Sequence, residues 1–303
     1  MKTLHFCAGL EEWNGMANTA RQFVDEERAK GDDSKLTSDI GAITNDVDQV
    51  VIHGAWLPVL WKVAKRAKDI GAKLIIRPAG SYDPVRLAYH GWKKRLVAPF
   101  EHKMLRRADV LLATCKAEVE WIKAYEPRVK KVEITDLKRF FNLSRVDRVE
   151  GRGVNVRVER VGGRPLHLLY LGRRHPLKGL EYLEAAVGQI QDSARSTCST
   201  RFKIDLRIVS NAFGEEKDRV LDWCDVLILP TLSENFGRVI AEALERGKRV
   251  ITTDGAPAWG DGNDYGGCLI YLKGYREGTK DIRVQLLKGT ITKIISGEGV
   301  NNE

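Results

Sequence analysis

The sequence predicts an α/β fold made of two doubly wound domains, each with a parallel sheet between layers of helices. Three observations carry this prediction. Short β-branched or apolar runs alternate with stretches that have apolar residues at helical spacing, the alternation occurs in both halves, and a charged, glycine-rich segment separates the halves. With 303 residues, 43% apolar and 30% charged, the chain is long enough for two domains and has the composition of a globular protein.

In the first half, buried-type strands alternate with amphipathic helices. Gly31 and Gly71 stand where two of these helices are expected to end. The expected strands are Lys2–Ala8, Gln49–His53, Lys73–Arg77, Asp109–Thr114 and Lys131–Thr135, and the expected helices are Met16–Lys30, Leu57–Ile70, Lys94–Ala108 and Ala117–Glu126.

The second half repeats the pattern after a charged, glycine-rich linker at residues 151–164. Domains are therefore expected at 1–150 and 165–303, with a cleft between the carboxyl ends of the two sheets, where open α/β sheets place their ligands. The expected strands are Leu166–Leu171, Lys203–Val209, Asp225–Leu229, Arg249–Thr253 and Cys268–Leu272, and the expected helices are Gly179–Ile190 and Gly237–Arg246.

The charge balance favours an anionic partner. The chain has 50 Lys and Arg against 41 Asp and Glu, a formal net charge of +9, which permits a nucleic acid, a membrane surface or a phosphorylated substrate and selects none of them. No apolar segment has the length of a membrane span or a signal peptide, so a cytoplasmic location is expected. The five cysteines are scattered without metal-ligand spacing and predict neither disulfides nor a zinc site.

Several catalytic signatures are absent from the sequence. It has no dinucleotide-binding G-x-G-x-x-G after a strand, no P-loop, no H-E-x-x-H and no G-x-S-x-G. Of the isolated histidines, His5 lies inside a predicted strand and is expected to be a core residue. His53 ends a strand just before Gly54, so a structural role and a functional role both remain open.

The first informative block runs from Leu168 to Gly179, where a strand is followed by a glycine turn, Arg173 and Lys178. A strand-to-helix turn directs backbone N–H groups and the positive end of a helix dipole toward the edge of the sheet, which favours an anion. Arg173 would add a fork that matches phosphate oxygens, and Lys178 a movable point charge. The alternative is a solvated basic loop.

The second block runs from Leu227 to Gly247 and contains a predicted helix that Ser233 or Asn235 can cap and Gly247 can end. Glu234 precedes this helix and Glu242 borders its apolar stripe. Eight residues at ~1.5 Å each separate the two carboxylates by up to ~12 Å. Such a pair can bind hydroxyls at two ends of an extended ligand, with a phosphate at the helix N-terminus between them. The two blocks together therefore indicate a nucleotide sugar.

Gly172-Arg173, Lys178-Gly179, the run Ser-Glu-Asn-Phe-Gly at 233–237 and the Glu234/Glu242 spacing resemble family 4 of the GT-B glycosyltransferases, the group 1 glycosyltransferases. The segment Arg249–Trp259 extends the likeness toward members that build bacterial lipopolysaccharide and capsule polysaccharide. The resemblance implies two Rossmann-like domains, the first on the acceptor side and the second on the nucleotide-sugar side.

The resemblance also implies a retaining hexosyltransferase that needs no metal or other cofactor. In its catalytic set, Arg173 and Lys178 would neutralise the departing diphosphate and Glu234 would hold hydroxyls of the transferred sugar. Glu242 would accept hydrogen bonds from the ribose, amides at Gly237 and Arg238 would contact phosphate, and Gly15 would let the backbone approach the donor closely. The donor-binding set is therefore Glu242, Gly237, Arg238, Gly15, Asn235 and Phe236.

The chain departs from the family pattern in three places. Ala79-Gly80 stands where many relatives have His-Gly, which leaves His53 and Arg77 as candidates on the acceptor or sugar side. The segment between Ser210 and Asp225 is short, so the donor base cannot be deduced. The tail after Trp259 is brief, so a reduced C-terminal helix is expected.

The segment Tyr89–Arg107 mixes aromatic, apolar and basic residues around a single acid, Glu101. Basic amphipathic segments bind anionic lipid headgroups, so this segment is a candidate for peripheral attachment to the membrane; the alternative is an ordinary helix with a solvated basic face. The candidate patch consists of Trp92, Lys93, Lys94, Arg106 and Arg107.

The sequence thus predicts a hexosyltransferase that uses a nucleotide sugar and a glycan or lipid-linked acceptor of the cell envelope. The alternative is a non-catalytic relative that serves as a nucleotide-binding or partner-binding subunit. No nucleic-acid partner is expected, because no helix-turn-helix, zinc-finger or aromatic-basic RNA motif is recognisable.

Overall fold

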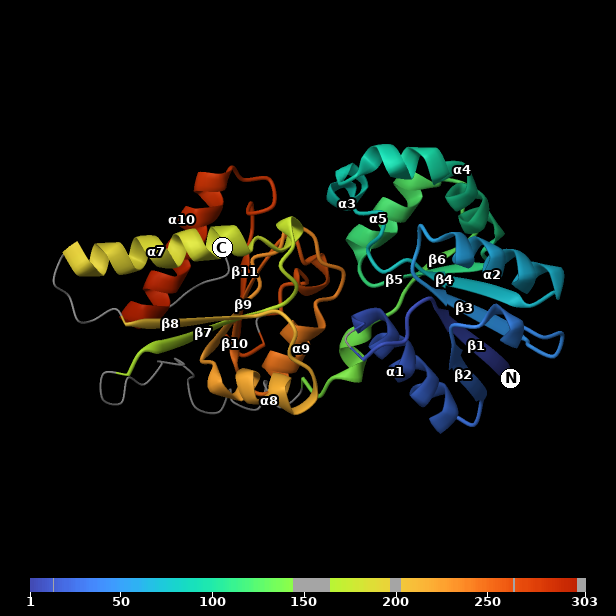
Figure 1. The fold of residues 1–303 in the computed structure, drawn as a ribbon, viewed down its shortest axis with the longest axis horizontal. Helices are drawn as coiled ribbons and strands as arrows, with labels where there is room; N and C mark the ends of the chain where they lie inside the picture. The colour runs from blue at the N-terminus through green and yellow to red at the C-terminus, as the bar shows by residue number, and fades with distance from the viewer. Residues whose placement is uncertain (13, 144–163, 197–202, 264, 299–303) are drawn as a thin grey trace. The chain divides into compact units, whose positions relative to one another are not determined.

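The polypeptide folds into two units, Met1–Leu137 and Lys138–Glu303 (Figure 1). The computed structural model describes residues 1–12, 14–143, 164–196, 203–263 and 265–298. The linker expected at 151–164 lies outside the described residues, apart from Arg164. Cys198 also lies outside them. The other four cysteines are free thiols, as expected.

The first unit is built on a six-stranded sheet with the order β2-β1-β3-β4-β5-β6, in which all pairs are parallel. Apart from β2 and β6 at the two edges, the strands are mostly buried, as expected for a parallel sheet covered on both faces. The strands are β1 (Lys2–Cys7), β2 (Asp33–Thr37), β3 (Gln49–His53), β4 (Lys73–Arg77), β5 (Val110–Ala113) and β6 (Val132–Ile134).

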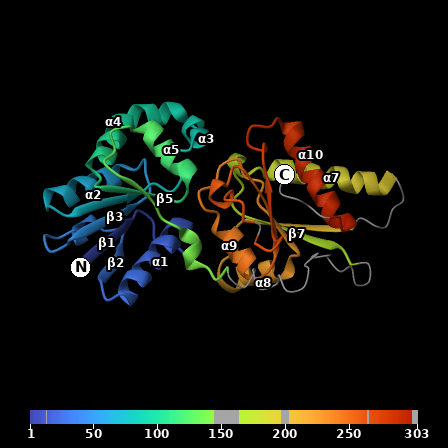
Figure 2. The same cartoon turned by 180° about the vertical axis from the view of Figure 1, so that it is seen from behind.

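Helices cover both faces of this sheet: α1 packs on one face, and α2, α4 and α5 on the other (Figures 1 and 2). On the second face, Phe6, Ile52 and Ile76 from three strands pack with Leu60 and Leu105 from two helices. The helices are α1 (Gly15–Ala29), α2 (Pro58–Asp69), α3 (Pro84–Ala88), α4 (Gly91–Arg107) and α5 (Lys116–Tyr125), with 3₁₀ turns at Ile40–Ala42 and Leu137–Phe140.

The second unit has a five-stranded parallel sheet with the order β11-β10-β9-β7-β8. Helices α7 and α10 lie side by side on one face, and α8 and α9 lie on the other (Figures 1 and 2). The elements are β7 (Leu166–Leu171), α7 (Leu180–Ser196), β8 (Ile204–Val209), α8 (Gly214–Trp223), β9 (Val226–Ile228), α9 (Arg238–Glu245), β10 (Arg249–Thr253), β11 (Leu269–Leu272) and α10 (Lys280–Ser296), with 3₁₀ turns at Pro176–Lys178 and Pro257–Trp259.

The tail after Trp259, where a reduced C-terminal helix is expected, contains the helix α10. Helix α10 has 17 residues, with Thr279 accepting a hydrogen bond from the Ile282 amide at its start and Gly297 (φ +77°) ending it. Its buried residues recur at helical spacing from Val284 to Ile295, and the helix packs along α7. Apolar burial against a neighbouring helix thus stabilises α10.

Residues 138–143 follow the first unit along the chain but belong to the second unit. The Asn142 amide donates to Glu245 Oε1 at 2.6 Å, and the rings of Phe141 and Phe236 lie 5.7 Å apart. Residues from Lys138 to Leu143 are therefore packed against the same unit as α9.

Within the described ranges, the helices are either too short or too polar to cross a membrane.

Candidate active site

The candidate site of the second unit lies at the carboxyl edge of its sheet. The strand order reverses between β7 and β9, because β8 lies on one side of β7 and β9 on the other. Ligands of open α/β sheets bind outside the carboxyl ends of strands at this switch point. The loops that follow β7 and β9 carry the two sequence blocks identified above, so the fold brings the blocks together.

The loop after β7 is held tightly against the loop after β9. Gly179 has φ +64°, and a Cβ at this position would lie 2.0 Å from the Pro230 carbonyl oxygen, so only glycine fits. The Leu177 carbonyl accepts hydrogen bonds from the Leu232 amide (2.8 Å) and the Thr231 hydroxyl (3.0 Å). These contacts fix the backbone on either side of Lys178.

Lys178 and Glu234, predicted separately as phosphate and sugar ligands, form an ion pair. Their side chains are 13% and 17% exposed, so the pair is largely shielded from water yet reachable. The Glu234 amide donates to the Gly255 carbonyl at 2.7 Å, and the Asn235 amide donates to Glu234 Oε1 at 3.1 Å. The carboxylate is therefore held by its own loop as well as by the lysine.

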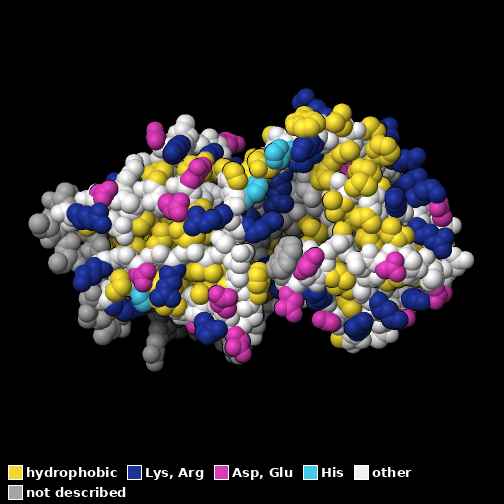
Figure 3. Space-filling model, viewed as in Figure 1, with side chains coloured by type: hydrophobic (Ala, Val, Ile, Leu, Met, Phe, Trp, Pro, Cys, Tyr) yellow, Lys and Arg dark blue, Asp and Glu magenta, His cyan; other side chains and the backbone are white. Residues whose placement is uncertain are grey.

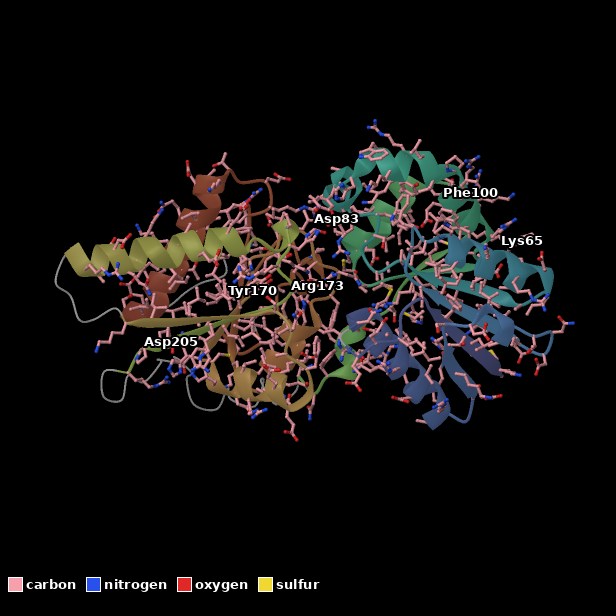
Figure 4. The ribbon with its side chains drawn as sticks, in the orientation of Figure 1. Lys65, Asp83, Phe100, Tyr170, Arg173 and Asp205 are labelled. Carbon is pink, nitrogen blue, oxygen red and sulfur yellow. The ribbon has the colours of Figure 1, made fainter. Side chains whose placement is uncertain are left out.

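Arg173 extends the positive charge at this edge. Its side chain is exposed and has no ion-pair partner among the described residues, whereas the next residue, Arg174, approaches Glu184 at 3.7 Å. Tyr170 supports the turn by donating its hydroxyl to the Arg173 carbonyl at 2.8 Å (Figure 4). Burial and the nearby Glu234 charge raise the pKa of Tyr170 to about 12, so this hydroxyl remains a donor at neutral pH.

Helix α9 starts differently from the sequence-based expectation. Gly237, and not Ser233 or Asn235, occupies the N-cap, with φ +65°. This left-handed conformation explains the glycine at this position. Phe236 is buried, with its ring 5.3 Å from Trp259, so this residue contributes packing and backbone rather than an exposed ring.

Glu242, at the border of the buried stripe of α9, lies between two cations, and such pairing offsets the cost of burying a charge. Lys217 Nζ is 3.1 Å from Glu242 Oε1, and an Arg238 nitrogen is 3.7 Å away. Burial lowers the pKa of Arg238, against the opposing charges of Glu242 and Glu245. Lys217 was missed from the sequence because α8 was not predicted; the acidic first turn at Glu215 and Glu216 was the available signal.

In the first unit, Gly15 begins α1 directly after Asn14, whose side chain accepts from the Met16 amide at 3.0 Å. His53 and Arg77 are brought together, with an Arg77 nitrogen 3.5 Å from His53 Nδ1, and both are 2% exposed. His5 is a buried core residue, as expected, and contacts His53.

Two buried glutamates hold the loops at the carboxyl edge of the first sheet, and neither was predicted to do so. Glu101 accepts from the Trp56 amide (3.2 Å), the Trp61 indole (2.6 Å) and the Tyr82 hydroxyl (2.6 Å). Glu118 accepts from the Gly80 amide at 2.5 Å and from the amide and hydroxyl of Thr114 at 2.8 and 2.7 Å. Burial raises the pKa of Glu101, although its hydrogen bonds oppose the shift.

The loops that these glutamates hold are conformationally unusual. Trp56 has φ +68° and Ala79 has φ +54°, in the left-handed region that non-glycine residues rarely adopt. Such backbone persists only where surrounding contacts determine it, and it concentrates at functional sites.

On α4, apolar residues form an exposed stripe: Trp92, Leu96 and Phe100 are 63%, 71% and 57% exposed (Figures 3 and 4). The predicted cations divide into two groups. Lys93 is exposed beside the stripe, whereas Lys94 donates to backbone carbonyls of Arg86 and Tyr89. Arg106 donates to the His102 carbonyl and approaches Glu126, and Arg107 is half-buried. Arg95 and Lys103 are further exposed cations on this helix.

The described residues hold no group of three or more His, Cys, Asp or Glu side chains arranged to bind a metal ion.

Two family models match the sequence. A glycosyl transferase 4-like domain matches residues 35–135, and a glycosyl transferases group 1 model matches residues 165–277. No curated protein matches the chain by sequence.

Solved structures share the fold at low identity. A sucrose-phosphate synthase from Thermosynechococcus elongatus is similar with a TM-score of 0.66 and 12% identity over 99% of this chain and 92% of that one. Anabaena Alr3699/HepE in complex with UDP-glucose has a TM-score of 0.60 and 14% identity over 99% and 93%. The α,α-trehalose 6-phosphate synthase from Burkholderia multivorans has a TM-score of 0.52 and 13% identity over 96% and 75%.

The two matched domains, the two parallel sheets and the shared fold lead to one conclusion: the chain belongs to the group 1, family 4-like glycosyltransferases and has the GT-B fold.

Proposed function

We propose that this glycosyltransferase moves a hexose-type sugar, with retention of configuration, from a nucleotide-diphosphate sugar to a glycan or lipid-linked acceptor of the cell envelope. The observation that carries the proposal is the Lys178–Glu234 pair at the switch point of the second sheet, beside the N-terminus of α9. The Anabaena neighbour was solved with UDP-glucose, and a Burkholderia xenovorans neighbour is named as a UDP-forming synthase, which makes a UDP-sugar the first donor to test.

Lys178 and Glu234, although paired, can still contact the diphosphate and the sugar of such a donor. A lysine ammonium has three hydrogens, and Glu234 engages only part of them, so Lys178 can also donate to phosphate oxygens. The Glu234 carboxylate, held by Lys178 and by the Asn235 amide, is 17% exposed and can therefore be reached by sugar hydroxyls. One ion pair can therefore contact the diphosphate and the sugar on either side of the bond that breaks.

The leaving group gains negative charge as that bond breaks. Lys178, the exposed Arg173 and the dipole of α9 would all stabilise this charge, and preorganised positive groups act most strongly where charge develops. We assign the neutralisation of the diphosphate to these groups rather than to a metal ion. Glu242, held between Lys217 and Arg238, would accept the ribose hydroxyls.

The acceptor part of the proposal draws on α4. A stripe of exposed apolar side chains with Lys93, Arg95 and Lys103 beside it has the chemistry that binds an anionic membrane surface. Peripheral attachment at the cytoplasmic membrane would give the enzyme access to a lipid-linked acceptor of the lipopolysaccharide or polysaccharide type.

Sugar transfer or donor hydrolysis with a panel of UDP-, GDP- and ADP-sugars tests the proposal. Glu234→Ala should lower turnover by at least about 100-fold, because it removes the group assigned to the sugar hydroxyls. Glu184→Ala, which removes an exposed glutamate on α7, should leave turnover unchanged. Equal rates for wild type and Glu234→Ala contradict the assignment.

The same panel separates the enzyme from a non-catalytic relative. Nucleotide binding without turnover on any donor would favour a binding subunit. For an active enzyme, proton NMR of the product reports the anomeric configuration, and an inverted product would refute the retaining mechanism. Activity in excess chelator reports metal dependence, and loss of activity there would refute metal independence.

A further inference from the structure

Four polar side chains form a continuous row through the first unit. Glu27 Oε2 on α1 is 2.9 Å from His5 Nε2 on β1, and His5 Nδ1 is 2.9 Å from His53 Nε2 on β3. His53 Nδ1 is in turn 3.5 Å from an Arg77 nitrogen on β4. His5, His53 and Arg77 are 1%, 2% and 2% exposed, so water does not compete for these contacts.

The two imidazoles meet edge to edge. Their centroids are 5.2 Å apart and their planes differ by 23°, which together with the 2.9 Å nitrogen separation describes a hydrogen bond in the ring planes rather than a face-to-face stack. Phe23 of α1 packs near both rings, with centroid distances of 6.2 and 6.0 Å. The two rings are therefore buried beside an aromatic side chain, and buried ring nitrogens need hydrogen-bond partners, which the row supplies.

Only one placement of protons fits every contact in the row. The ionised Glu27 carboxylate only accepts, so the proton of the His5 ring is on Nε2 and His5 Nδ1 has a lone pair. His53 therefore donates its Nε2 proton to His5 Nδ1, which leaves a lone pair on His53 Nδ1 facing the Arg77 guanidinium, a group that only donates. Burial, with smaller contributions from the neighbouring His5 and Arg77, lowers the pKa of His53, which agrees with a neutral ring.

At the other end of the row, Glu27 is ionised. Burial raises the pKa of Glu27, but the hydrogen bond from His5 and the nearby Ser34 hydroxyl outweigh this effect, and the pKa is lowered. The row thus has a carboxylate at one end, a guanidinium at the other and two neutral rings with a defined direction between them.

The Arg77 end of this row lies at the ligand-binding edge of the sheet. The strand register aligns Cys7 with His53 and His53 with Arg77, at the carboxyl ends of β1, β3 and β4. The strand order reverses between β1 and β3, so this edge is the switch point of the first unit. The left-handed residues of the two loops stand close by in sequence: Trp56 is three residues after His53, and Ala79 is two residues after Arg77.

We propose that Glu27 and His5 are positioning residues for glycosyl transfer: by fixing the tautomer of His53 they hold Arg77, and the loops that follow β3 and β4, in one arrangement at the sugar-binding edge of the first unit. That the reaction is transfer of a sugar rests on the proposed function. Displacing groups by about 1 Å at such an edge can cost about 100-fold in rate.

Nitrogen NMR of protein labelled in its histidine rings tests the row directly. In the wild type at neutral pH, His53 should be the Nε2-protonated tautomer. Glu27→Gln keeps an oxygen that can accept from His5 and should keep this tautomer. Glu27→Ala and His5→Phe, which retains a ring of similar shape, should both lose it. Glu26→Ala, a change at the neighbouring position on α1, is the matched control and should behave as wild type.

Kinetics with the donor found in the panel give the second readout. Glu27→Ala should lower the kcat/KM of transfer by at least about tenfold, Glu27→Gln should restore most of it, and nucleotide affinity should stay unchanged because the nucleotide site is in the second unit. An Nδ1-protonated His53 in the wild type, or a Glu27→Ala variant with unaltered tautomer and rate, overturns the proposal. The NMR spectrum tests the hydrogen-bonded row even if the protein turns over no donor. A failure of the proposed glycosyl transfer can therefore be told apart from a failure of the positioning role.

Discussion

Glu101, Glu118 and Glu234 are three carboxylates that each hold a loop at the carboxyl edge of a sheet. The first two are buried, and each receives three or more protein donors. Glu234 is held by a lysine and an amide but remains 17% exposed. A buried carboxylate needs protein partners, so Glu101 and Glu118 serve the structure, whereas Glu234 is exposed enough for a ligand to contact it.

A residue-scale prediction concerns acid stability. The pKa of His53 is well below 6.5 in the folded protein because of burial, with smaller effects of His5 and Arg77, and it is about 6.5 in the unfolded chain. Between these values the unfolded chain binds one more proton, so the free energy of unfolding falls as pH drops below about 6.5, by up to about 1.4 kcal/mol per pH unit. Above about pH 6.5 this contribution is constant.

Melting temperatures at pH 7.5 and 5.5 check this prediction. His53→Gln should lower the melting temperature at pH 7.5 but reduce the further loss at pH 5.5 relative to wild type. His90→Asn, which removes an exposed histidine in a left-handed conformation that asparagine tolerates, is the control for loss of a histidine. An acid-induced loss in His53→Gln as large as in the wild type contradicts the mechanism.

At the scale of elements, the strands could be predicted well because their signal is local. Gln49–His53, Lys73–Arg77, Leu166–Leu171 and Arg249–Thr253 form strands with the bounds that their apolar runs predict. The strand β2 was missed because Asp33–Thr37 is polar and lies at an edge of the sheet, where one neighbour suffices. Helices α3, α8 and α10 were missed although each has a local signal: α3 has Asp83 as its N-cap, α8 has an acidic first turn, and α10 has buried residues at helical spacing.

The start and end of α9 offer a matched pair of substitutions. Gly237 and Gly247 both have φ +65°, so alanine at either should cost about 1–2 kcal/mol of backbone strain. A Cβ at Gly247 has no atom within 4 Å, whereas one at Gly237 would lie 3.0 Å from an Ile240 carbon and 3.1 Å from Glu234 Cγ. Gly237→Ala should therefore also displace Glu234.

Thermal melting and donor titration measure the two effects. Gly247→Ala should lower stability and leave donor affinity unchanged. Gly237→Ala should lower stability further and weaken donor binding by about tenfold, the equivalent of about 1.4 kcal/mol. If the two variants bind the donor equally well, the backbone at Gly237 does not position the site.

For the whole molecule, the net charge of +9 has several distinct uses. Lys178 and Arg173 belong to the candidate donor site, and Arg77 is enclosed in a buried row. Lys93, Arg95 and Lys103 stand exposed beside the apolar stripe of α4. The first group is thus placed for a diphosphate and the α4 cations for an anionic surface, whereas Arg77 is not exposed to either.

Vesicle binding checks the membrane assignment. Each basic residue near an anionic surface contributes about 1 kcal/mol, so changing Lys93, Arg95 and Lys103 to Gln should weaken binding to vesicles with anionic lipid by about 100-fold at low salt. The same change at exposed Lys30, Lys35 and Lys73 removes equal charge elsewhere and should have little effect. Binding should fall with salt and be weak on neutral vesicles; equal loss in both triple variants would indicate only generic charge attraction.

The sequence by itself determined the alternation of strands and helices, the parallel sheets and the two loop blocks of the candidate donor site, because apolar periodicity and turn residues act over short stretches of chain. Tertiary structure alone decided which charges meet. Lys178 pairs with Glu234 across 56 residues, and His5 meets His53 across 48. These partners depend on the strand order and register, which place distant residues at one edge of a sheet, and no local pattern encodes that placement.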